Sequence, residues 1–208
     1  MLVPHTKAVV AARKKLGNVP VVTVDSMYRL DELSVSVDNF SGGQTATEHL
    51  LSLGHTNIVH ISGPKSWFEA TARSSGYAAA MLAAGHRPHI VDGDWSADAG
   101  YSIALEMSFL ERGVTAVFAA NDYTALGVLK AVSQRGIRVP EDLSVVGFDD
   151  VPESGYFIPS LTTMRQDFAK LGRQALSLLL SQLDGNPESH SRPIVPTLVI
   201  RDSTAPAP

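Results

Sequence analysis

The sequence predicts an α/β protein built on a parallel β-sheet. Amphipathic stretches alternate with short β-branched runs along the 208 residues, and a glycine follows each amphipathic stretch. The composition fits this class, because 44% of the residues are hydrophobic and 18% are charged. A chain of this length buries roughly 70% of the surface of its unfolded form. That is enough for one large hydrophobic core or two small ones.

Helices are expected wherever apolar residues recur at helical spacing. A glycine follows each of them, because glycine adopts left-handed backbone without a Cβ clash and so ends a helix cheaply. The expected helices span residues 6–16, 41–53, 70–84, 97–112, 122–135 and 167–183, and the glycines are Gly17, Gly54, Gly85, Gly113, Gly136 and Gly185.

Short apolar runs between the helices are expected to be strands covered by helices on both faces. They span residues 21–24, 35–37, 58–61, 90–91, 116–119, 144–147, 161–164 and 198–200. Ligands meet such a sheet at the loops after its strands. These loops begin at Asp25, Ser62, Gly93, Asn121, Asp149 and Arg165. We expect residues 184–193 to form a surface connection and the tail 205–208 to be disordered.

Composition excludes several classes of function. Cysteine is absent, which excludes disulfides, a thiolate nucleophile and cysteine-ligated metals. No apolar run approaches the roughly 20 residues of a membrane span, and the first ten residues do not resemble an export signal, so we expect a cytoplasmic protein without a membrane partner. The net charge is −4 and the longest basic run is residues 13–15, so this chain alone is a poor match to DNA.

Motifs for catalysis are missing as well. Gly42 and Gly43 read as a pair that opens a helix rather than as a phosphate loop, and there is no Gly-x-Ser-x-Gly elbow. Asp149 and Asp150 are adjacent carboxylates, but consecutive residues after a strand point in opposite directions. We expect one of them to face a cleft and the other the backbone. The sequence therefore predicts no enzyme, no catalytic residue and no cofactor.

The histidines do not form a metal site in the sequence. His49 and His55 lie on a helix and just past its end, while His86 and His89 flank a turn from helix to strand. None has a partner at the i, i+4 spacing of helical metal ligands. We expect surface or capping roles for these histidines, and no bound metal.

A series of strings along the chain matches a known family. In order they are Val37-Asp38-Asn39 with Gly42-Gly43, Glu48-His49-Leu50 through Leu53-Gly54-His55, Ile61-Ser62-Gly63-Pro64, Arg73-Ser74-Ser75-Gly76-Tyr77, Ala119-Ala120-Asn121-Asp122, Val139-Pro140-Glu141-Asp142, the segment 144–150, the segment 159–163 and Gln166-Asp167-Phe168. They resemble the effector-binding core of the LacI/GalR, or lactose-repressor, family of transcriptional regulators. The resemblance covers nearly the whole chain.

The resemblance implies a periplasmic-binding-protein-like fold with two doubly wound parallel-sheet lobes joined by crossing strands. The carboxyl-terminal lobe would comprise residues 38–165 and 194–204. Residues 1–37 and 168–190 would be the remnant of an incomplete amino-terminal lobe. The family's DNA-binding helix-turn-helix would be absent, so the chain is expected to be truncated at its amino terminus relative to the family.

The resemblance also implies an effector site. A sugar offers hydroxyls that both donate and accept hydrogen bonds above an apolar ring face, which suits carboxylates, an amide, a guanidinium and an aromatic ring. Arg73 would donate a bidentate pair of hydrogen bonds to ring hydroxyls. Trp95 would carry the ring face. The expected effector-binding residues are Asp25 from the opposite lobe, Arg73, Trp95, Asn121, Asp149, and Gln166 and Phe168 at the hinge.

Four of these residues also have a purely structural interpretation. Trp95 could cap a helix start and pack on its lobe, and Asp149 could cap the turn before Pro152. Arg73 could pair with Glu69, and Asn121 could be the N-cap of the helix after it. Asp25 lies in the half-missing lobe.

The function that follows is the sensing of a small molecule, expected to be a carbohydrate. Effector binding would shift the population between two orientations of the lobes and thereby control operator DNA through the missing helix-turn-helix. We expect a homodimer. One alternative is a solute-binding protein of a sugar transporter, which would need an export signal. Another is an enzyme on a doubly wound sheet, which would need a nucleophile or a cofactor loop.

Overall fold

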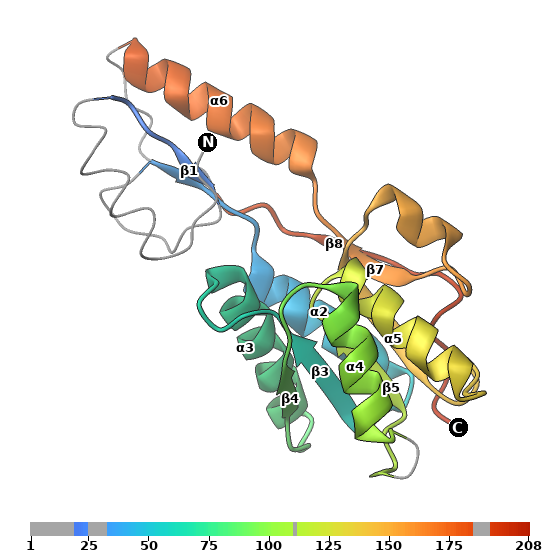
Figure 1. Cartoon of the computed structure of the whole chain (residues 1–208). Coiled ribbons are helices and arrows are strands. Elements are labelled where there is room, and N and C mark those ends of the chain that lie inside the picture. Colours follow the sequence, from blue (N-terminus) through green and yellow to red (C-terminus); the bar gives the residue numbers. More distant parts are fainter. Residues whose placement is uncertain (1–18, 25–32, 110–111, 185–191) are drawn as a thin grey trace.

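The computed structural model of the chain describes residues 19–24, 33–109, 112–184 and 192–208. The helix expected at 6–16 and the site residue Asp25 lie outside these residues. The structure contains a large six-stranded sheet and a small two-stranded sheet, which lie at opposite ends of the molecule (Figure 1).

The large sheet has the strand order β4-β3-β5-β6-β7-β8, and neighbouring strands are parallel except for the antiparallel pair β7-β8. The parallel α/β sheet predicted from the sequence is thus confirmed, with one antiparallel edge strand added. Its strands are β3 (Ile58–Ser62), β4 (His89–Asp92), β5 (Ala116–Ala119), β6 (Ser144–Asp149), β7 (Thr162–Arg165) and β8 (Thr197–Val199).

Helices cover both faces of the large sheet. On one face α2 (Asn39–Ser52) packs on α3 (Phe68–Ala83), and on the other α4 (Ala97–Met107) packs on α5 (Asp122–Gln134). The strands alternate between the two cores: in β5, Phe118 faces α2 and α3, whereas Val117 faces α4 and α5. Because helices cover both faces, side chains on both sides of the central strands are buried, and most of them are apolar.

Glycines let each helix pair approach closely. A Cβ on Gly127 of α5 would lie 1.9 Å from the carbonyl oxygen of Ala97 at the start of α4. A Cβ on Gly76 of α3 would lie 2.1 Å from the carbonyl oxygen of Phe40 on α2. No side chain fits at these crossings, so the glycines set the distance between the helices.

The small sheet is formed by β1 (Thr23–Val24) and β2 (Ser34–Val35), which pair in parallel, and α6 (Phe168–Leu183) packs against it. Its core is separate from those of the large sheet. A parallel bridge joins Val37 to Ile194 where two segments of the chain pass between the sheets (Figure 1). The core residues are Val22, Val24, Val35, Val37, Leu171, Leu178 and Ile194.

The helix expected at 97–112 is shorter than predicted. It ends at Met107, because Ser108 adopts a left-handed backbone with φ 45° and the next residue, Phe109, is buried in the core with 1% exposure. The apolar pattern continues past the helix end, which is why the sequence did not reveal this end. The other described helices lie within three residues of their expected bounds.

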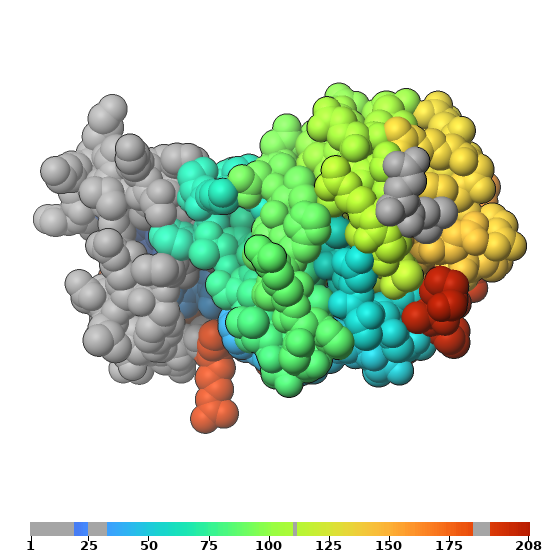
Figure 2. All heavy atoms as spheres, turned by 90° about the horizontal axis from the view of Figure 1, so that it is seen from below, coloured from blue at the N-terminus to red at the C-terminus, as the bar shows by residue number. Residues whose placement is uncertain are grey.

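The prediction of a disordered tail at 205–208 is wrong. The carbonyl oxygen of Ala205 accepts a hydrogen bond from His55 Nε2 at 3.0 Å, and the Ala207 N–H donates to the Leu53 carbonyl at 2.8 Å. Figure 2 shows the red carboxyl-terminal residues against the cyan segment that includes α2. The tail is ordered by contacts with residues far away in the sequence, which its composition does not reveal.

The surface or capping role expected for His55 is wrong, because its ring is buried with 1% exposure. It contacts the hydroxyls of Thr115 at 2.9 Å and Ser144 at 3.0 Å. His60, in the middle of β3, is also buried: its ring stacks on Phe118, and burial lowers its pKa to about 4. Among the residues that the structure describes, no three potential ligands gather as a metal site, and no helix is long and apolar enough to span a membrane.

Candidate functional site

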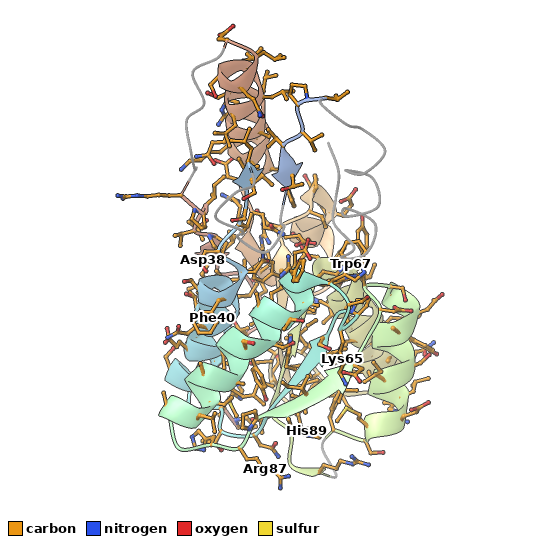
Figure 3. All side chains as sticks on the ribbon, turned by 90° about the vertical axis from the view of Figure 1, so that its left-hand side faces the viewer. Asp38, Phe40, Lys65, Trp67, Arg87 and His89 are labelled. Carbon is orange, nitrogen blue, oxygen red and sulfur yellow. The ribbon has the colours of Figure 1, made fainter. Side chains whose placement is uncertain are left out.

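The candidate site lies at the carboxyl ends of β3, β5 and β6, where the large sheet faces the small one. Parallel strands bring the loops that follow them to one edge, which places residues from distant parts of the sequence together. Figure 3 shows Asp38 and Trp67 at the end of the large sheet that faces the small sheet, while Arg87 and His89 lie at the opposite end of the large sheet.

Arg73, on α3, is the centre of the site and is only 4% exposed. Its Nε donates to Asn39 Oδ1 at 2.8 Å, and its Nη1 donates to the Ala120 carbonyl at 2.5 Å. The guanidinium carbon lies 3.7 Å from the centroid of the Phe148 ring. These contacts hold a buried cation in one orientation. The pair of Arg73 with Glu69 that the sequence also suggested stays a prediction.

Asp149 is the negative partner of Arg73. Its Oδ1 lies 3.4 Å from Arg73 Nη1 and accepts a hydrogen bond from Gln166 Nε2 at 2.5 Å. Burial raises the pKa of Asp149, and the Arg73 charge and the Gln166 hydrogen bond oppose this rise. Within the described part of the chain, Oδ2 of Asp149 accepts no hydrogen bond. This oxygen can accept a further hydrogen bond.

Asp150 points away from Asp149, as expected, but the prediction that it faces the backbone is wrong. Its carboxylate accepts hydrogen bonds from Arg165 Nε at 2.5 Å, from Arg201 Nη2 at 2.6 Å and from the Ser154 hydroxyl at 3.2 Å. Burial raises the pKa of Asp150, but the hydrogen bonds from the two arginines outweigh it and leave the pKa below its usual value. Asp150 is a structural residue.

Asn121 joins two of the loops. Its Oδ1 accepts from the Thr124 N–H at 2.8 Å, which caps α5 as the sequence suggested, and its Nδ2 donates to the Trp95 carbonyl at 3.0 Å. One N–H and one lone pair of the amide remain for another partner.

Trp95 packs on its lobe, as its structural interpretation proposed. A Cβ on Gly63 would lie 2.4 Å from its ring, and Trp67 meets it edge-on with centroids 6.2 Å apart. The helix cap belongs instead to Ser96, whose hydroxyl accepts from the Ala99 N–H. The indole Nε1 of Trp95 is buried and has no hydrogen-bond partner among the described residues.

The two hinge residues differ. Gln166 is 8% exposed and contacts Asp149 twice, through its side chain and through its N–H, which donates to the Asp149 carbonyl at 3.3 Å. Phe168 begins α6 and is 54% exposed. The structure therefore brings Arg73, Trp95, Asn121, Asp149 and Gln166 into one connected group. The expectation for Asp25 falls on a residue outside the described ranges.

Sequence reasoning missed two residues of this group. Asn39 opens α2 and orients Arg73, and Asp122 opens α5 with 0% exposure behind the site. Asp122, not Asp149, accepts from the Val151 N–H before Pro152. Each lies at the start of a helix that follows a strand, which is the one signal that could have identified them.

Two hollows flank α3. One, of about 440 Å³, opens beside Asn39 and is also lined by Asp38, Phe40 and Glu69. The other, of about 420 Å³, lies between α3 and the edge strand β4. The first adjoins Asn39, which accepts a hydrogen bond from Arg73.

Comparison with known proteins identifies the family. The model of the periplasmic binding protein-like domain matches residues 47–204. The chain is 34% identical over 194 residues to the transcriptional repressor PurR of Haemophilus influenzae, and 34% identical over 202 residues to the lactose operon repressor of Escherichia coli. These matches cover 90% and 96% of this chain, and 58% and 55% of the relatives' lengths.

Solved structures agree in fold. A dimeric lac repressor with a C-terminal deletion superimposes with a TM-score of 0.87 at 32% identity, over 96% of this chain and 74% of that chain. A LacI-family regulator from Enterococcus faecium with bound ribose superimposes with a TM-score of 0.85 at 30% identity, over 98% and 77% of the two chains. The chain belongs to the LacI family, with its periplasmic-binding-protein-like fold. The LacI-family relatives named here are repressors and regulators, not enzymes.

Proposed function

We propose that this chain is the effector-binding core of a LacI-family transcriptional regulator, and that its effector is a small carbohydrate. The observation that carries the proposal is the buried Arg73, which is held by Asn39 and the Ala120 carbonyl beside Asp149. Vicinal hydroxyls of a sugar suit this pair. They can accept hydrogen bonds from the fixed Arg73 guanidinium and donate to the free oxygen of the Asp149 carboxylate.

Trp95 and Asn121 extend the same match. The Trp95 ring supplies an apolar face of the kind that stacks on a sugar ring, and its buried Nε1 is a donor without a partner among the described residues. Asn121 keeps one donor and one acceptor site after its two structural bonds. Gln166 and Phe168 would bound the site at the hinge. The Enterococcus faecium relative, which contains ribose, supports a sugar as the effector class.

Control of transcription would operate through the orientation of two lobes. We assign residues 38–165 and 194–204 to one lobe and residues 1–37 and 168–190 to the other. The two sheets have separate cores, and the chain passes between them at Val37 and Ile194. An effector that contacts both lobes would favour one orientation, and the reorientation would control operator DNA through the helix-turn-helix of the whole regulator.

A second copy of the chain is the proposed protein partner. Tyr156 and Ile158, which lie at and just after the 3₁₀ helix η2 (Pro152–Tyr156), are 87% and 93% exposed. Two large apolar side chains that are this exposed and only two residues apart are candidates for part of an interaction surface. The similar lac repressor structure is dimeric. These observations support a homodimer that uses this surface.

Thermal unfolding with a panel of small molecules tests the effector class. Ribose, galactose, glucose and the purines hypoxanthine and guanine are each added in excess, because a ligand of the folded state raises the unfolding midpoint. We expect a sugar to raise the midpoint. Asp149→Asn should reduce the shift, whereas Asp142→Asn, at a partly exposed carboxylate paired with Arg138, should keep it. A shift with a purine and with no sugar would overturn the assignment of the effector class.

A further inference from the structure

The first residue of α5, Asp122, is fully buried behind the candidate site and is not among the expected effector contacts. Its Oδ1 accepts a hydrogen bond from the Thr163 hydroxyl of β7 at 2.5 Å, and its Oδ2 accepts from the Val151 N–H at 2.8 Å. A Cβ on Gly147 would lie 2.4 Å from Asp122 Oδ1, so the carboxylate is in direct contact with β6. Asp122 therefore ties α5 to both β7 and the turn after β6.

The turn that Asp122 holds is the one that carries Asp149. Asp149 and Asp150 have φ values of 114° and 58°, and non-glycine residues rarely adopt such a backbone unless their surroundings hold it. The turn is held at each of its residues. Gln166 contacts Asp149, Arg165 and Arg201 bind Asp150, and Asp122 binds Val151. The Asp122 bond is the only one of these contacts that comes from α5.

The neighbouring residue connects this arrangement to the other side of the site. Asn121 donates to the Trp95 carbonyl, so the amino terminus of α5 contacts the Trp95 loop through one residue and the Asp149 turn through the next. Both loops are set by a single rigid helix end.

We propose that Asp122 is a positioning residue of the effector site, which holds the strained turn so that the free oxygen of Asp149 faces the effector. This inference rests on the proposed function. Asp122 does not contact the effector itself, because it is buried behind the turn.

The electrostatic environment of Asp122 makes Asp122→Asn a conservative test of its role. Burial raises the pKa of Asp122 to about 7, and the Asp149 and Asp150 carboxylates add to the rise, while the hydrogen bonds from Thr163 and Val151 oppose it. An asparagine resembles the protonated form: its amide oxygen can accept from the Val151 N–H, and its amide nitrogen can donate to the Thr163 hydroxyl. Asp122→Asn should therefore keep the turn, whereas Asp122→Ala removes both bonds.

The experiment is a double-mutant cycle between Asp122 and Asp149. Its readout is the dissociation constant of the panel sugar that gives the largest thermal shift with the wild-type chain. We expect Asp122→Ala to weaken binding roughly tenfold in the wild-type background and less than about twofold in the Asp149→Asn background. Asp122→Asn should stay within about threefold of wild type. The control Thr47→Ala, which removes a buried hydrogen bond on α2 outside the site, should leave the affinity unchanged.

Equal losses in the two backgrounds would show that Asp122 acts independently of Asp149 and would overturn the proposal. An Asp122→Asn variant as weak as Asp122→Ala would overturn it too. If Asp149→Asn abolishes measurable binding, the cycle is replaced by two other comparisons. These are the affinity of Asp122→Asn against that of Asp122→Ala, and the hydrogen exchange of the Val151 N–H in the same variants.

Amide hydrogen exchange at Val151 tests the hold on the turn without any effector. The Val151 N–H should exchange slowly in the wild-type chain and in Asp122→Asn, and at least tenfold faster in Asp122→Ala. Rapid exchange in the wild-type chain would overturn the inference. If no sugar binds the wild-type chain, the proposed function fails, and the exchange rates still decide whether Asp122 holds this turn.

Discussion

Replacement of Arg73 by methionine tests the geometry at the centre of the site. Methionine keeps the apolar stem over Phe148 but removes the guanidinium, which is 3.4 Å from Asp149 and donates to Asn39 and Ala120. The side chains of Arg73 and Asp149 are only 5% and 20% exposed, so the pair is largely shielded from water. Breaking a buried pair on one side costs about 3–5 kcal/mol, because the remaining charge is buried alone.

This loss is large against the roughly 5–15 kcal/mol by which domains are stable. The assay is urea unfolding at pH 5 and pH 8, with the free energy taken from the midpoint and slope. Without Arg73 the pKa of Asp149 rises further in the folded state. A carboxyl whose pKa is higher in the folded state than in the unfolded state stabilises the protein at low pH. This stabilisation is lost as the pH rises through the folded-state pKa. Arg73→Met should therefore lower the free energy of unfolding more at pH 8 than at pH 5.

The double variant Arg73→Met with Asp149→Asn should recover most of the loss at pH 8, because no buried carboxylate is left without a counter-charge. A loss below about 1 kcal/mol for the single variant, or no recovery in the double variant, would refute the reasoning that the two groups form a buried pair.

Three further predictions follow from other parts of the structure. Because the pKa of Asp122 is raised to about 7, its contribution to stability is lost as the pH rises towards 8. In urea unfolding between pH 5 and pH 8, the free energy of unfolding should therefore fall less for Asp122→Asn than for the wild-type chain. Gly127→Ala should lower the thermal midpoint by several degrees, since the new Cβ would clash with the Ala97 carbonyl. Gly85→Ala is the control for backbone strain, because Gly85 has a φ of 78° but open space around it, so that this variant adds strain without crowding. Ile158→Asp should convert the proposed dimer to monomers in sedimentation velocity without lowering the thermal midpoint of the monomer, and an unchanged sedimentation coefficient would contradict the assignment of this surface.

Several features of the site were predictable because a local pattern encodes them. Asn121 follows an apolar strand and precedes a helix, so both its place at the sheet edge and its capping bond follow from its neighbours. Asp149 and Asp150 diverge because consecutive side chains after a strand point apart. What Asp150 meets could not be predicted, because Arg201 comes from a segment 51 residues away.

Long-range packing also decided the errors. The tail was expected to be free because its own composition is simple, yet it is held by His55 and Leu53. His55 in turn was expected at the surface because nothing in its local sequence shows that Ser144 and Ala205 would surround it. Contacts of this kind depend on which strands become neighbours, and local periodicity carries no information about that.

The amino-acid sequence by itself determined the alternation of helices and strands, the parallel sheet and the loops at which a ligand site could form, since each depends on periodicity and on neighbouring residues. Only the tertiary structure decided that Asn39 and Ala120 orient Arg73 and that Asp122 holds the turn of Asp149. Those contacts join α2, α3, β5, α5 and β6, and their geometry exists only after the strands have paired and the helices have packed on them.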